Sequence, residues 1–183
     1  MIYTSNAFVL PLPSGHRFPM AKYARLAERV TRLAGALMHV PDAATDAELL
    51  RAHDAGYVDA VSRGTLDDRA LRRIGFPWSP AMVERSRRSA GATLAACRSA
   101  LDHGVGINLA GGTHHAHRAH GEGFCVFNDA AVAARAMQAE GLARRVLVVD
   151  LDVHQGDGTA AIFEGDATVT TRSVHGRQNF PFR

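Results

Sequence analysis

The stretch that decides the fold is VVDLDVHQGDG, residues 148–158. Its apolar start continues a run that begins at Val146, and an unbroken β-branched run of this kind is typical of a buried strand in a parallel sheet. If the chain stays extended beyond this run, Asp150, Asp152 and His154 occupy alternate positions and project to the same side. The stretch therefore predicts a core strand whose end presents three polar side chains together.

Two carboxylates and an imidazole at one strand end indicate a metal site, because they are poorly solvated there and the carboxylates repel each other without a cation. Oxygen and nitrogen donors with no thiolate suit Zn²⁺, Mn²⁺ or Fe²⁺. The alternative is a polar loop whose aspartates cap the following helix, a role open to Asp157. Three inward polar residues directly after a core strand fit that alternative poorly, so we expect a metal site.

Histidines gather in a second segment, GGTHHAHRAHGEGFCVFND, residues 111–129. A His-rich loop taken alone is more often an incidental metal patch. Here, however, the adjacent His114 and His115 can reach one pocket from a turn, and histidine suits proton transfer near neutral pH. Asp150 and Asp157 are available to fix the ring tautomers. Together the two segments predict metal-assisted hydrolysis, in which a cation polarises a carbonyl and a histidine carries the proton.

Two neighbours of the histidine segment carry weaker signals. Phe124, after a Gly-Glu-Gly turn, either forms an apolar wall for a slender substrate or packs in the core. Cys125 is expected to pack as a small apolar side chain. Because Cys97 is the other cysteine and no CxxC pair exists, a disulfide scaffold and a cysteine-based zinc finger are both excluded.

Composition restricts the class of protein. The chain has 183 residues, 46% of them hydrophobic, and a net charge of +3, which predicts a single folded domain and excludes intrinsic disorder. No apolar run is long enough for a membrane span, and the N-terminus lacks a secretory pattern, so we expect a cytoplasmic protein. Arg85, Arg87 and Arg88 are interpreted as the solvated face of a helix, and no nucleic-acid binding is expected.

Helical and strand patterns alternate along the chain. This alternation predicts an α/β fold with a mostly parallel sheet and functional residues at the carboxyl ends of its strands. The stretch 65–80 is polar and reads as irregular. We expect helices near residues 20–38, 44–54, 56–64, 80–101, 130–141 and 160–165, and strands at residues 2–4, 106–110, 146–149 and 167–174.

Several sequence blocks resemble the histone deacetylase superfamily. GGTHH (111–115), GFCVFND (123–129) and VDLDVHQGDG (149–158) match its signature in order and spacing. GHRFPMAKY, IGFPWSP and SVHGRQNFPFR are similar to its bacterial members. The resemblance implies a three-layer, parallel-sheet α/β architecture, the arginase/deacetylase fold. It also implies zinc-dependent removal of acetyl or other acyl groups, with an acetylated lysine or another acetylated amine as partner.

The resemblance also implies roles for individual residues. Asp152 and His154 would bind zinc. His114 and His115 would be the catalytic histidines, backed by Asp150 and Asp157 respectively, with His115 as the general base. Gly123 and Phe124 would line the acyl-lysine channel opposite Phe180, and Arg17 the inner cavity. A structural K⁺ would be held, mostly through backbone oxygens, by Asp150, Asp152, His154, Ser173 and Val174.

Members of this superfamily are longer than this chain. Their third zinc ligand, an aspartate, and the tyrosine that polarises the substrate carbonyl follow the position of Arg183. The resemblance therefore implies that residues 1–183 form the N-terminal portion of one deacetylase-like domain, incomplete at the C-terminus. An unpaired sheet edge and exposed apolar surface would result.

Two alternatives stay open. One is a non-catalytic remnant or binding module of the same fold. The other is an arginase-type ureohydrolase with two manganese ions, which would need a denser set of aspartates and histidines. The natural substrate and the oligomeric state are not specified by the sequence.

Overall fold

The computed structural model describes residues 1–182, so Arg183, the last residue of the predicted domain, lies outside the described residues. The helices are α1 Ala21–Ala34, α2 Asp46–Leu49, α3 Ala55–Arg63, α4 Asp68–Ile74, α5 Pro80–His103, α6 Asp129–Ala139 and α7 Asp157–Ile162, with a 3₁₀ turn at Gly35–Leu37. The strands are β1 Ile2–Tyr3, β2 Met38–His39, β3 Ile107–Asn108, β4 Val146–Asp150 and β5 Val169–Ser173.

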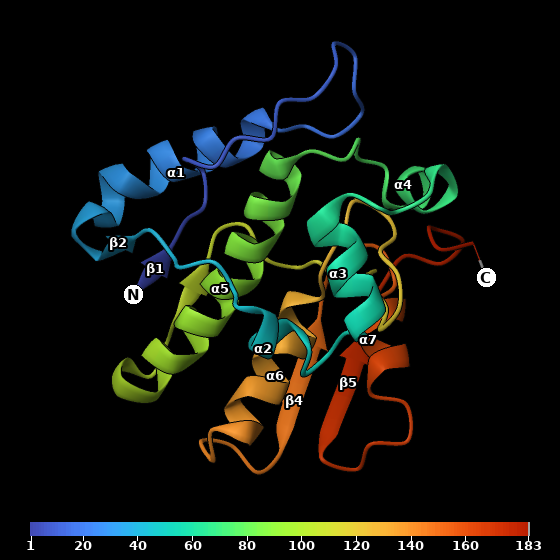
Figure 1. Cartoon of the computed structure of the whole chain (residues 1–183). Helices are drawn as coiled ribbons and strands as arrows, with labels where there is room; N and C mark the ends of the chain where they lie inside the picture. The colour runs from blue at the N-terminus through green and yellow to red at the C-terminus, as the bar shows by residue number, and fades with distance from the viewer. Residues whose placement is uncertain (183) are drawn as a thin grey trace.

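All strand pairs in residues 1–182 are parallel, as predicted. They form two small sheets, with strand orders β2-β1-β3 and β4-β5. The long helix α5 runs through the middle of the molecule and packs against α6, β1 and β3 (Figure 1). β4 and β5 lie side by side with α6 next to them, which places the carboxyl end of β4 close to the start of α7 (Figure 1).

The core lies where α5 and α6 cross, and small residues permit their close approach. Ala131, Ala134 and Ala136 of α6 are buried against it. Gly91 of α5 allows another close approach, that of the loop before α2, because a Cβ atom at this position would lie 2.0 Å from the Asp42 carbonyl oxygen. Four side chains accept hydrogen bonds from the first turns of helices, as expected of N-caps: Thr45, Asp67, Ser79 and Asn128.

The prediction that residues 65–80 are irregular is wrong for the middle of this stretch. Helix α4 occupies Asp68–Ile74, begins at the Asp67 cap and ends at Gly75, whose φ is 85°. The helix is short and carries three arginines, so its apolar spacing is weak. Fully buried Ile74 is its main anchor in the core.

The prediction that β4 is buried on both faces is also wrong. Burial alternates along the strand, and the side chains of Leu147 and Val149 are 61% and 56% exposed. Val146 and Val148 on the opposite face pack against the core. β-branched composition indicates a strand, but it does not reveal whether one face or both are covered. The expected exposed apolar surface is confirmed on this face of β4.

The prediction that Arg85, Arg87 and Arg88 of α5 form a solvated face is wrong. Arg85 is only 7% exposed, and its guanidinium lies 4.1 Å from the Tyr23 ring centroid. Arg87 and Arg88 donate hydrogen bonds to the carbonyl oxygens of Ala44 and Pro41. Arg87 and Arg88 thus fasten the loop of residues 41–44 to α5, a role that helical spacing alone cannot reveal. None of the helices in residues 1–182 combines the length and apolar character that crossing a bilayer requires.

Candidate functional site

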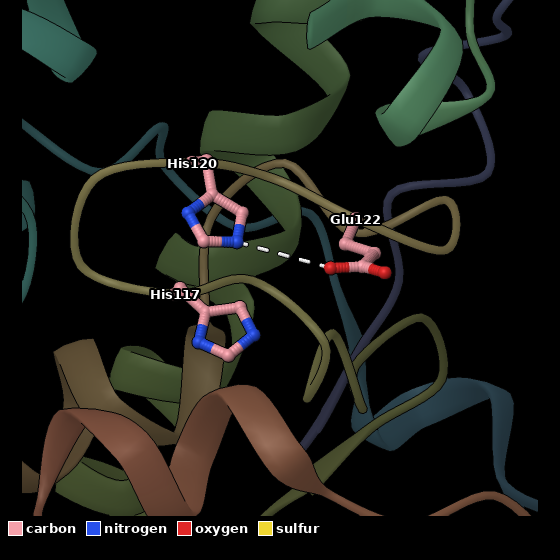
Figure 2. A group of neighbouring side chains, drawn as sticks. All are labelled: His117, His120 and Glu122. Atoms are coloured by element: carbon pink, nitrogen blue, oxygen red, sulfur yellow. Dashed lines mark ion pairs between the residues drawn. The ribbon is translucent and has the colours of Figure 1, made fainter. Parts of the chain in front are cut away.

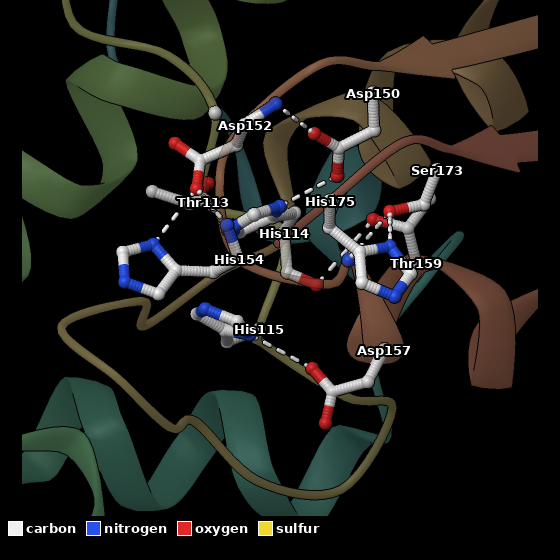
Figure 3. Close-up of polar contacts among 12 residues, drawn as sticks. Thr113, His114, His115, Asp150, Asp152, His154, Asp157, Thr159, Ser173 and His175 are labelled. Atoms are coloured by element: carbon white, nitrogen blue, oxygen red, sulfur yellow. Dashed lines mark hydrogen bonds and ion pairs between the residues drawn. The ribbon is translucent and has the colours of Figure 1, made fainter. Parts of the chain in front are cut away.

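The two predicted segments meet at a cavity of about 1060 Å³ at the carboxyl end of β4. His114, His115, Asp152 and His154 all line this cavity, and their side chains lie close together (Figure 3). The position follows from the parallel sheet, in which polar residues after the strands collect at one edge. The structure thus brings together residues that are some 40 positions apart in the chain.

The chain is not fully extended after β4, contrary to the expectation. The strand ends at Asp150, and two turns follow in which each aspartate accepts a backbone hydrogen bond two residues on. The Asp152 amide donates to Asp150 Oδ1 (3.0 Å), and the His154 amide donates to Asp152 Oδ1 (2.8 Å). Such turns, called Asx-turns, are common at aspartate residues. Asp152 and His154 still line the cavity, while Leu151 and Val153 between them are exposed.

Each catalytic-histidine candidate is hydrogen-bonded to one carboxylate. His114 Nδ1 lies 2.5 Å from Asp150 Oδ2, and His115 Nδ1 lies 2.8 Å from Asp157 Oδ1. Both histidines are buried, and their ring centroids are 4.1 Å apart. A carboxylate at Nδ1 places the proton on that nitrogen and leaves Nε2 as the basic atom. Asp157 does this from the first residue of α7, so it orients a histidine instead of capping the helix.

A buried polar network holds the histidine turn, and sequence reasoning missed it. Asp129 accepts hydrogen bonds from the amides of Gly112 and Thr113 and from the Thr93 hydroxyl. Asn128 donates to the Ala116 carbonyl oxygen at 3.0 Å. The available signal was a polar pair at the start of an otherwise alanine-rich helix.

Helix α7 approaches this turn closely because residue 158 is glycine. A Cβ atom on Gly158 would lie 2.6 Å from the His114 carbonyl oxygen and 2.5 Å from that of Ala116. Asp157 therefore reaches His115 only because its neighbour has no side chain.

The carboxylates of Asp152 and Asp157 are ionised near neutral pH. Burial acts to raise the pKa of Asp157, but the hydrogen bond and charge of His115, the charge of His117 and the Gly158 amide together outweigh it and hold the pKa below the usual 3.8. The pKa of Asp152 is lowered in the same way, with burial opposed by hydrogen bonds from His154. Cys125 differs, because burial raises the pKa of its thiol to about 12, so it packs as an apolar side chain as expected.

Asp152 and His154 fit a divalent metal ion. Asp152 Oδ1 and His154 Nδ1 lie 2.8 Å apart, and His114 Nε2 is 3.9 Å from the same Asp152 oxygen. The donors are one carboxylate and one imidazole, a set that suits zinc. Catalytic zinc usually has three protein ligands, and these residues supply two.

The segments expected to hold K⁺ lie side by side. Ser173 pairs with Asp150 in the β4–β5 register, and the Val174 amide donates to the Asp150 carbonyl oxygen at 2.9 Å. The Ser173 hydroxyl lies 2.9 Å from His175 Nδ1. These contacts bring Asp150 and residues 173–174 side by side.

Aromatic side chains form the apolar part of the cavity. Phe180 packs edge-on against His115, with ring centroids 4.8 Å apart. Gly123 and Phe124 occupy a tight turn with φ of 57° and 67°, and a Cβ atom on Gly123 would come within 2.8 Å of the His115 ring. Arg17 also lines the cavity. Three further cations there were missed from the sequence: Lys22, Arg72 and Arg73.

Comparison with known proteins decides the family. The sequence model of the histone deacetylase domain matches residues 16–183. The chain belongs to the histone deacetylase family. An uncharacterized protein of Picosynechococcus sp. is 47% identical over 178 residues, which cover 95% of this chain and 59% of that protein. The acetoin utilization protein AcuC of Staphylococcus aureus is 34% identical over 152 residues, covering 78% of this chain and 39% of AcuC.

Solved structures of the histone deacetylase family agree with the fold. An HDAC homolog complexed with SAHA superposes with a TM-score of 0.82 at 26% identity, covering all of this chain and 52% of that one. An HDAC homolog from Aquifex aeolicus gives a TM-score of 0.83 at 25% identity, covering 99% of this chain and 52% of that one. The predicted parallel-sheet arginase/deacetylase fold is thereby confirmed. This chain spans about half the length of the relatives it matches.

Proposed function

We propose that this chain carries the metal-binding and proton-transfer residues of a zinc-dependent deacetylase that removes acetyl or related acyl groups from lysine-type amines. The observation that supports this most directly is the pair of histidine–carboxylate hydrogen bonds beside Asp152 and His154 in one cavity. Residues 1–183 are proposed to be the N-terminal portion of a single deacetylase domain.

His115 is the proposed general base. Its Nδ1 proton is held by Asp157, so Nε2 is free to accept a proton from the attacking water, and the Asp157 carboxylate stabilises the imidazolium that forms. His114 is held in the same way by Asp150 and acts as its electrostatic and proton-shuttling partner. Zinc held by Asp152 and His154 would polarise the scissile carbonyl and lower the pKa of the attacking water.

The proposed substrate is a slender acylated amine that enters beside Phe124 and Phe180, with Gly123 leaving room for it; the exposed Arg17 also lines the cavity. The polyamine deacetylase HDAC10 of Rattus norvegicus is 38% identical to this chain over 143 residues. The match covers 72% of this chain and 24% of HDAC10. This relative supports an acetylated amine as the substrate class. K⁺ is proposed between residues 150–154 and 173–174, and a bacterial cytoplasm as the setting.

Activity is best tested on the product of the complete reading frame, with an acetyl-lysine peptide and an acetylated polyamine as substrates. Loss of a general base removes about 10²- to 10⁴-fold of rate. We therefore expect His115→Ala to lower kcat by about that factor with bound zinc unchanged, and Asp152→Ala to lose zinc and turnover together.

The exposed His103 on α5 provides the control, and His103→Ala should behave as wild type. Turnover at the wild-type rate in both His115→Ala and Asp152→Ala would overturn the proposal. Binding of the acetylated amine with no turnover by the wild-type product would instead support the binding-module alternative.

A further inference from the structure

Three side chains beside the catalytic-histidine candidates converge on one point, and one of them, Glu122, also lines the cavity described above. His117, His120 and Glu122 each offer a ligand atom, and these atoms all lie within 4.8 Å of one another (Figure 2). They belong to the loop between the catalytic-histidine candidates and the Gly123–Phe124 turn. The proposed deacetylase chemistry does not use them.

The loop that carries these side chains is held firmly. The His117 amide donates to the His120 carbonyl oxygen at 2.8 Å, which closes a tight turn, and the two rings stack with centroids 4.4 Å apart. His53 Nδ1 lies 2.9 Å from the His117 carbonyl oxygen, and this hydrogen bond holds the turn in place. The Glu122 amide donates to the Cys125 carbonyl oxygen at 3.0 Å. The three ligand atoms are therefore brought together by the backbone before any ion arrives.

Burial and charge at this point favour a cation. The side chains of His117, His120 and Glu122 are 12%, 34% and 17% exposed. They are therefore largely shielded from solvent, but an ion can reach them past the half-buried His120. His117 Nε2 is buried and makes no hydrogen bond within residues 1–182, although Asp157 Oδ2 lies 3.5 Å from it. Two carboxylates, Glu122 and Asp157, thus share a small, half-buried volume with two imidazoles.

We propose that His117, His120 and Glu122 form a second metal site, separate from Asp152 and His154, for Zn²⁺ or a similar divalent transition ion. Two imidazoles and one carboxylate are a donor set that proteins use for zinc. Ligand atoms around one zinc lie about 3–3.5 Å apart, given bonds of about 2.0–2.2 Å. Contraction from 4.8 Å to this spacing requires the two stacked rings to tilt toward each other and the Glu122 carboxylate to turn toward them.

The ordinary competitor of this proposal is an ion pair. His120 Nε2 lies 3.8 Å from Glu122 Oε2, and a protonated His120 would neutralise that carboxylate without any metal. An ion pair between His120 and Glu122 needs no metal, so it would produce no cobalt spectrum. The two explanations therefore separate in a metal titration.

The test is a Co²⁺ titration of the whole protein, followed by the visible absorption of bound cobalt. The Asp152→Ala/His154→Ala variant lacks the first site and isolates the second, so the result does not depend on the proposed deacetylase activity. We expect this variant to keep one cobalt equivalent. Adding His120→Ala should weaken its binding at least tenfold and abolish the spectrum, and adding Glu122→Gln should weaken it with the fold intact.

The matched control is His103→Ala in the same background, which should change neither affinity nor spectrum. Circular dichroism on each variant verifies that the fold is retained. The proposal is overturned if the variant without the first site binds no cobalt. It is equally overturned if His120→Ala and Glu122→Gln leave affinity and spectrum unchanged.

Discussion

At the scale of single residues, His53 shows how a buried histidine can be kept neutral. Its Nδ1 proton is donated to the His117 carbonyl oxygen at 2.9 Å, and its Nε2 accepts the Asn128 amide at 2.9 Å. A second proton on the ring would face that amide hydrogen. Burial accordingly lowers the pKa of His53 from 6.5 to about 4.

This lowered pKa predicts acid destabilisation. The unfolded chain takes up a proton on His53 below about pH 6.5, whereas the folded chain does so only near pH 4. Stability is therefore unaffected above pH 6.5 and falls as the pH drops toward 4, by about 3 kcal/mol for this group. Urea unfolding at a series of pH values measures the effect.

His53→Gln keeps a donor and an acceptor but does not titrate, so its stability should depend less on pH over this interval. His103→Gln, at an exposed position, should keep the wild-type slope. Equal slopes in wild type and His53→Gln would contradict the assignment.

The sequence predicted some residues of the site far better than others. His114, His115, Asp152 and His154 lie in short motifs directly after strands, and the parallel sheet then brings such positions to one edge. Arg85 could not be predicted in this way, because its burial depends on Tyr23 and on the loop near Phe8, both distant in sequence.

At the scale of elements, Asn128 joins two helices to the histidine turn. It is fully buried, and its Oδ1 caps α6 by accepting the Ala131 amide at 3.0 Å. Its Nδ2 donates to the Ala116 carbonyl oxygen and to the Thr159 hydroxyl at the start of α7, both at 3.0 Å. The same side chain therefore caps the N-terminus of α6 and positions α7.

Asn128→Ala should consequently cost more than the loss of an ordinary cap. A missing N-cap costs about 1 kcal/mol, and each polar group left buried without a partner costs about 1–3 kcal/mol. We expect a loss of about 2–4 kcal/mol in the free energy of unfolding, measured with a chemical denaturant. Thr45→Ala, which removes the exposed cap of α2, should cost about 1 kcal/mol or less. Equal losses in the two variants would show that the links to Ala116 and Thr159 contribute nothing.

Helices α2 and α4 show which helix boundaries can be predicted from the sequence. The start of α2 was predicted because Thr45 and Glu48 form a reciprocal capping pair, which is a local signal. Helix α4 was missed because Asp67 caps it without a partner glutamate and its stability comes from burying Ile74 in a distant core. Local chemistry can be predicted, whereas burial supplied by other segments cannot.

At the scale of the whole molecule, one face of the β4–β5 sheet sets this chain apart from a fully covered α/β domain. On the other face of this sheet, Val169 belongs to the core and Val146 and Val148 pack against it. Large apolar side chains are exposed on or just beyond the first face: Leu147, Val149, Leu151, Val153 and Val174. From Leu147 to Val153 they stand at every second position, and Val174 directly follows the neighbouring strand β5; we call this row the β4 strip, and it differs from scattered exposed apolar residues.

Such a strip should make the 183-residue chain bind an apolar-surface dye and associate with itself as its concentration rises. We expect Leu147→Gln combined with Val149→Thr to lower dye fluorescence and association without reducing stability, because neither side chain contributes to the core. Leu33→Gln on α1 is the control, since Leu33 is 87% exposed but lies away from this sheet. Fluorescence titration and sedimentation velocity measure the two effects. If Leu33→Gln lowers both signals as much as the β4 variant does, the association depends on total apolar exposure and not on the strip.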